Sequence, residues 1–204
     1  MRSVITGLLA ATASASVWAH VGVHADGGFS TGFAHPYFGL DHLLAMVAVG
    51  IWAVQIGGRC LVALPATFVA FMAVGAALGT AGVPLPQVEG VVAVSVLVLG
   101  CAVGLSGKKV SDTIFATGQR KWCLTPFSPF FLVAAFALFH GHAHGTEMPD
   151  FSSPWQYFAG FAIATAVLHA LGVAAGVLLK SHPAILRAGG AAIGLAGGWL
   201  VVSL

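Results

Sequence analysis

Two histidine-rich segments of this 204-residue chain each lie within an apolar stretch long enough to cross a membrane. The first runs from His35 to Met46 and contains Asp41 and His42, and the second runs from Phe139 to Glu147 and contains three histidines. Imidazole and carboxylate groups are costly to place in hydrocarbon, so clusters of them are rarely present for packing alone. They offer nitrogen and oxygen ligands to first-row divalent metal ions. The pattern therefore indicates a membrane protein that binds and carries a metal ion.

The spacing of the first segment predicts a column of ligands on one helix. His35 and His42 are seven residues apart, which is two helical turns and places them on one face. Met46 follows one turn beyond His42, and Pro36 suits the first turn of such a helix. Asp41 points about 100° away from His42. Its carboxylate could bind the metal directly, or it could hydrogen-bond a histidine that does so.

The second segment predicts a further set of ligands on another helix. His140, His144 and Glu147 share a helical face, whereas His142 points away from that face if the helix is regular. The glycines beside these histidines leave open an unwound stretch that would turn all three imidazoles inward. A single histidine in a membrane is often only a packed side chain. Three histidines and a carboxylate in eight residues favour a metal site.

The composition is that of an integral membrane protein. Hydrophobic residues make up 58% of the chain and charged residues only 7%, which is outside the range of soluble globular proteins. The net charge is close to zero and there is no basic run, which argues against nucleic acid as a partner. The three cysteines show no paired spacing, so neither a disulfide scaffold nor a thiolate zinc site is expected.

The N-terminal residues resemble a secretory signal peptide. Arg2 is followed by an apolar run over 4–15 and by the small-residue cleavage signal that ends at Ala19. Cleavage there would leave His20 as the first residue, and an uncleaved signal anchor is the alternative. We therefore predict a signal peptide over 1–19 and a single transmembrane domain over 20–204.

Six apolar stretches in the remaining chain are long enough to span a bilayer as helices. They lie near 36–57, 60–80, 88–106, 126–145, 154–179 and 183–203. The predicted fold is all-α, a polytopic membrane bundle of six transmembrane helices. Glycines spaced four residues apart in several of these stretches predict close helix packing, and a homo-oligomer remains open.

Charge placement predicts the orientation of this bundle. Every basic residue after the signal peptide falls in or beside the first, third or fifth connection, which therefore face the cytoplasm by the positive-inside rule. Both mature termini are then extracytoplasmic in a bacterial inner membrane. The two histidine-rich segments both lie near the outer ends of their helices, so they are expected to meet. Secondary candidate metal ligands are Met46, His142, His169, His20 and His24.

The two motifs resemble the signatures of the HupE/UreJ family of nickel/cobalt permeases. These are His-Pro-x-x-Gly-x-Asp-His-x-x-Ala-Met from His35 and Phe-His-Gly-x-Ala-His-Gly-x-Glu from Phe139, and the similarity in layout covers nearly the whole chain. The variable position after Gly141 carries the additional histidine. The resemblance implies metal-binding roles for His35, Asp41, His42, His140, His144 and Glu147.

We expect a secondary transporter that moves divalent nickel or cobalt into the cytoplasm, with the lipid bilayer and the metal ion as its partners. No phosphate-binding loop is present, so ATP hydrolysis by this chain is not expected. No prosthetic group and no enzymatic activity are expected. Two alternatives remain: a membrane metalloenzyme with Glu147 as general acid or base, and a b-type haem protein with His42 and His144 as axial ligands.

Overall fold

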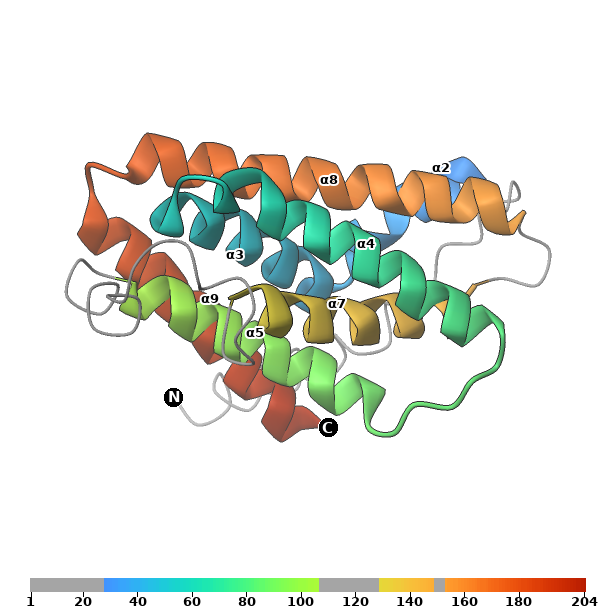
Figure 1. Ribbon diagram of the computed structural model, residues 1–204. Helices are drawn as coiled ribbons and strands as arrows, with labels where there is room; N and C mark the ends of the chain where they lie inside the picture. The colour runs from blue at the N-terminus through green and yellow to red at the C-terminus, as the bar shows by residue number, and fades with distance from the viewer. Residues whose placement is uncertain (1–27, 107–128, 149–152) are drawn as a thin grey trace, which may run out of the picture.

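The computed structural model describes residues 28–106, 129–148 and 153–204, and within these ranges all regular structure is helical. The helices are α2 (Phe29–Phe38), α3 (Leu40–Ile56), α4 (Cys60–Thr80), α5 (Val88–Leu105), α7 (Pro129–Thr146), α8 (Pro154–Leu179) and α9 (Pro183–Ser203) (Figure 1). This confirms the prediction of an all-helical protein. The predicted signal peptide, His20 and His24 lie outside the described residues.

Several of these helices have the length and composition of membrane spans. Helices α4, α5, α8 and α9 are each long and apolar enough to cross a bilayer, and the bent pair α2 and α3 meets the same criterion when the two helices are taken together. Helix α7 has 18 residues, the same length as α5, but its three histidines lower its mean hydropathy. The chain is therefore a multi-pass helical membrane protein, and the six-span count with α7 included stays a prediction.

The first predicted span is not one straight helix. Helices α2 and α3 meet at Gly39 at an angle of 85°, and Gly39 itself is extended (φ −86°, ψ 110°). Pro36 lies in the last turn of α2, not in a first turn as predicted, and it has no N–H group for helix bonding. Glycine is also a poor helix former, so the helix does not continue through Gly39. His35 and His42 therefore lie on different helices, and the prediction of a shared face is wrong.

Helices α4 and α7 pack with their backbones in contact. A side chain on Gly141 of α7 would overlap the carbonyl oxygen of Met72, and one on Gly75 of α4 would overlap that of Leu138. Contacts of this kind need small residues at the interface. The glycines of α7 therefore serve close packing against α4. Helix α7 is continuous through them, so the unwound stretch left open by the sequence is not observed.

The pairing of helices relates the two halves of the chain. Helix α3 runs parallel to α8 with Gly50 against Gly172, and α4 runs parallel to α7. Helix α5 runs antiparallel to α9, with Gly100 against Gly194 and Gly104 against Gly190. An exchange of the two halves replaces α3 with α7, α4 with α8 and α5 with α9, and the reverse. The α3–α8 pair then becomes the α7–α4 pair, and the α5–α9 pair stays the same. This is the pattern that an inverted repeat produces, as in many carriers.

The charged side chains of the described residues separate to opposite ends of the bundle. At the end where α4 connects to α5 lie the acidic residues Asp41, Glu89 and Glu147. At the end where α3 connects to α4 and α8 to α9 lie the basic residues Arg59, Lys180 and Arg187. The fold therefore carries the charge asymmetry on which the positive-inside rule depends.

Candidate metal centre

The two histidine-rich segments meet at the acidic end of the bundle. The ring centroids of His35 and His144 are 4.7 Å apart, those of His144 and His42 are 4.2 Å apart, and those of His42 and His140 are 4.7 Å apart. Four imidazoles from α2, α3 and α7 thus form a continuous row, which we call the histidine row. The predicted convergence of the two segments is confirmed, although three helices supply the rings instead of two.

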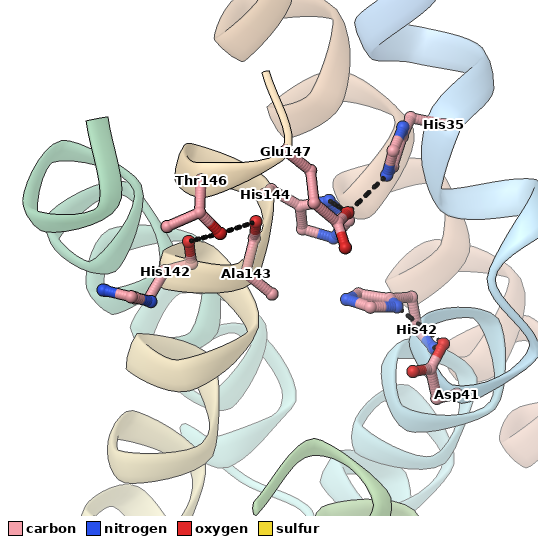
Figure 2. Close-up of polar contacts among 8 residues, drawn as sticks. All are labelled: His35, Asp41, His42, His142, Ala143, His144, Thr146 and Glu147. Carbon is pink, nitrogen blue, oxygen red and sulfur yellow. Dashed lines mark hydrogen bonds and ion pairs between the residues drawn. The ribbon is translucent and has the colours of Figure 1, made fainter. Parts of the chain in front are cut away.

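The exposed end of the histidine row includes a carboxylate. His35 Nε2 lies 3.4 Å from Glu147 Oε2, and His144 Nδ1 lies 4.0 Å from the same oxygen (Figure 2). One ligand atom from each of the three residues falls within 4.8 Å of the others. Glu147 is exposed and His144 is fully buried, so this group reaches from the surface into the protein. Two imidazole nitrogens and a carboxylate oxygen suit a first-row divalent ion.

Asp41 holds the His42 ring in place. Its Oδ1 atom lies 2.7 Å from His42 Nδ1 and also accepts a hydrogen bond of 2.8 Å from the His42 backbone N–H. An ionised carboxylate can only accept, so the ring proton is on Nδ1 and the lone pair is on Nε2. Of the two roles open to Asp41 from the sequence, the structure shows the hydrogen-bonding one, which orients the ring that faces the other histidines.

Ser95 of α5 performs the same task for His140. Its hydroxyl donates to the carbonyl oxygen of Val92 at 2.6 Å, and its Oγ lies 2.8 Å from His140 Nε2. A hydroxyl group has one hydrogen to donate, so His140 must donate its Nε2–H to Ser95. The lone pair of His140 is therefore on Nδ1. The sequence analysis missed Ser95, although a single serine in an otherwise apolar helix interior is a recognisable signal.

The nitrogens left over by these contacts are buried without partners. Within the described part of the chain, His42 Nε2, His140 Nδ1 and both nitrogens of His144 make no hydrogen bond. Buried polar atoms in proteins are nearly always paired, so such a group of exceptions needs an explanation. His42 Nε2 and His140 Nδ1 each carry a lone pair, and one of the two His144 nitrogens does so as well, because a neutral imidazole has a single N–H. Cations bound along the histidine row would satisfy these lone pairs.

Aromatic side chains form the walls of the histidine row. The Phe161 ring lies 4.0 Å from that of His144, the Tyr157 ring 6.0 Å from that of His35, and the Phe68 ring 5.6 Å from that of His140. These walls exclude water and lower the local dielectric, which strengthens interactions between a cation and its ligands.

The secondary candidates lie elsewhere. His142 Nε2 donates to the carbonyl oxygen of Val83, 2.7 Å away in the α4–α5 connection, so its ring faces away from the histidine row as a regular helix predicts. Met46 is buried in the apolar core one turn after His42. His169 is buried deeper in the bundle, against Phe68.

The haem alternative does not fit the two rings proposed for it. Axial histidines must lie on opposite faces of the haem, with the iron and the macrocycle between them. The ring centroids of His42 and His144 are 4.2 Å apart, which leaves no room for that arrangement.

Comparison with known proteins supports the resemblance seen in the motifs. The family model described as HupE / UreJ protein matches residues 8–200. The curated relative Protein HupE from Rhizobium leguminosarum bv. viciae is 43% identical over 203 residues, which is 98% of each chain. No solved structure matches the chain. A family match over nearly the whole length, with both histidine motifs in place, shows that the chain belongs to the HupE/UreJ family.

Proposed function

We propose that this protein is a permease that carries Ni²⁺, Co²⁺ or both across the bacterial inner membrane into the cytoplasm. The histidine row is the observation that carries the proposal: four imidazoles lead from the exposed Glu147 to the fully buried His140. The association of the HupE/UreJ family with nickel and cobalt transport supports the choice of cargo. We assign the protein no catalytic role.

The row suits stepwise dehydration of an incoming ion. A hydrated ion first meets Glu147, His35 and His144, where it exchanges water for carboxylate oxygen and imidazole nitrogen. His42 and His140 follow at ring separations of 4.2 and 4.7 Å, so each ligand can be replaced by the next without full release. Protonated imidazoles do not bind metal, so uptake should fall as the external pH is lowered.

The membrane potential can drive this transfer without a coupled ion. Moving a charge inward gains about 2.3 kcal/mol per 100 mV, so a divalent cation gains about twice that. Transport is directed into the cytoplasm if the acidic end of the bundle faces outward and the basic end faces the cytoplasm. Both mature termini are then extracytoplasmic. A topology reporter fused after Leu204 that is active only in the cytoplasm would contradict this orientation.

Uptake of radioactive nickel and cobalt at low external concentration tests the proposal. His42→Ala and His144→Ala each remove a ligand from the row, and loss of even a supporting residue around a metal lowers affinity about 10–100-fold. We expect uptake to fall at least that far. His182→Ala is the matched control, since His182 is exposed at the opposite end and contacts Ser181.

The abundance of each variant in the membrane has to be measured alongside uptake. If both row variants insert normally and transport like the parent, the histidine row is not the pathway. If the parent transports neither ion but catalyses a reaction that both variants lose, the metalloenzyme alternative is correct instead.

A further inference from the structure

A fifth buried histidine lies beyond the inner end of the histidine row. His169 of α8 is 2% exposed; its ring contacts the Thr165 backbone, and in the described residues at least one of its ring nitrogens has no hydrogen-bond partner. The Phe68 ring separates it from the row, with its centroid 5.6 Å from that of His140 and 5.0 Å from that of His169. The row therefore continues inward through one aromatic ring to another unsatisfied imidazole.

Two further donor atoms lie beside His169. Thr165 is one turn before it on α8, and the Thr165 hydroxyl contacts Met72 Sδ at 3.6 Å. Met72 is one turn after Phe68 on α4, so the two antiparallel helices face each other through these residues. A hydroxyl that donates to a thioether sulfur is weakly satisfied, because sulfur is a poor acceptor. Nitrogen, oxygen and sulfur donors are thus gathered in a buried position.

We propose that His169, Met72 and Thr165 form a second, inner site for the transported ion. This inference rests on the proposed function. Imidazole suits nickel and cobalt, and the thioether adds a soft, neutral donor. No carboxylate belongs to this set, whereas Glu147 and Asp41 lie at the outer end of the pathway. The inner site therefore holds a divalent ion more weakly, and conduction needs sites weak enough to release their ion.

The surroundings of His169 fit a last binding step before release. His169 borders a groove of about 1000 Å³ between the inner halves of α4 and α8, and the other residues that line this groove are all apolar. The groove lies toward the basic end of the bundle, which the proposed orientation places at the cytoplasm. In the described part of the groove no further ligand would retain an ion that has left His169.

Metal binding by the full-length protein in lipid nanodiscs tests this inference with nickel as the probe. We expect one tightly bound equivalent and a second, weaker one. Met72→Leu keeps the volume and removes the sulfur, and His169→Leu removes the imidazole; each should abolish only the weaker equivalent. Both should lower the maximal uptake rate in proteoliposomes several-fold while the half-saturating concentration stays near that of the parent.

X-ray absorption at the nickel edge adds a direct measure of the ligands. A sulfur neighbour should appear when the second equivalent is loaded and should be absent in Met72→Leu. Phe71→Leu, a lipid-facing change next to Met72, and His182→Leu are the matched controls and should retain both equivalents.

The outcomes separate this inference from the proposed function. If the parent binds the tight equivalent and transports nickel, but both variants match it in binding and rate, the inner site does not exist and the carrier stands. Absence of a sulfur neighbour at full loading removes Met72 from the site and overturns the inference as stated. If the parent binds no tight equivalent and does not transport, the proposed function fails and the inner site fails with it.

Discussion

Replacing Ser95 with alanine tests whether the proton positions in the histidine row govern metal binding. Ser95 is fully buried and accepts the Nε2–H of His140, which leaves Nδ1 free to bind a cation. Ser95→Ala removes this acceptor without adding atoms. His140 then either keeps a buried N–H without a partner or moves its proton to Nδ1, where it blocks the lone pair.

Each of these two outcomes for His140 has an energetic cost of known size. A buried donor left without a partner is destabilised by about 1–3 kcal/mol. Loss of a residue that orients a metal-binding histidine lowers affinity about 10–100-fold, which is about 1.4–2.8 kcal/mol. The first figure is a loss of folding stability and the second a loss of metal affinity, so the second sets the expectation that Ser95→Ala weakens nickel binding by about 10–100-fold.

Isothermal titration of purified protein with nickel measures this change directly. Ser106→Ala is the matched control, because Ser106 follows the same helix, also donates to a backbone carbonyl and lies at the opposite end of the bundle. Ser95→Thr keeps the hydroxyl and should retain most of the affinity. If Ser95→Ala is folded and binds nickel as tightly as the parent, the proton assignment for His140 is wrong.

Two further substitutions separate the residues around the site by their roles. A methyl group at Gly39 would lie 2.9 Å from both Asp41 Oδ1 and His42 Nδ1, so Gly39→Ala should displace this pair and reduce metal uptake while membrane insertion stays normal. Full uptake by this variant would show that the Asp41–His42 geometry does not matter. His142→Leu should lower the stability by about 1 kcal/mol, because the bond to Val83 is lost, without changing metal affinity. Thermal denaturation and nickel titration measure the two quantities, and a loss of affinity as large as that of His144→Ala would place His142 in the row.

Most helices could be predicted from the sequence because their causes are local. Apolar runs bounded by Gly, Pro and polar residues predicted spans at 60–80 and 183–203, which are the bounds of α4 and α9. Helical periodicity also placed His140 and His144 on one face and turned His142 away from it. Side-chain direction along a helix depends on residue spacing alone, so no knowledge of neighbouring helices was needed.

The remaining features depend on contacts between distant residues. Pro36 and Gly39 permit a break after α2, but the 85° bend follows the packing of both α2 and α3 along α8, as with Gly32 against Tyr157 and Gly50 against Gly172. Ser95 and His140 are 45 residues apart, and Thr165 and Met72 are 93 apart. Hydrogen bonds over such separations form only after the helices have packed. The sequence by itself therefore determined which side chains could bind a metal. The tertiary structure decided which of their atoms are free to do so, because at His42 and His140 a partner holds one ring nitrogen and leaves the other free.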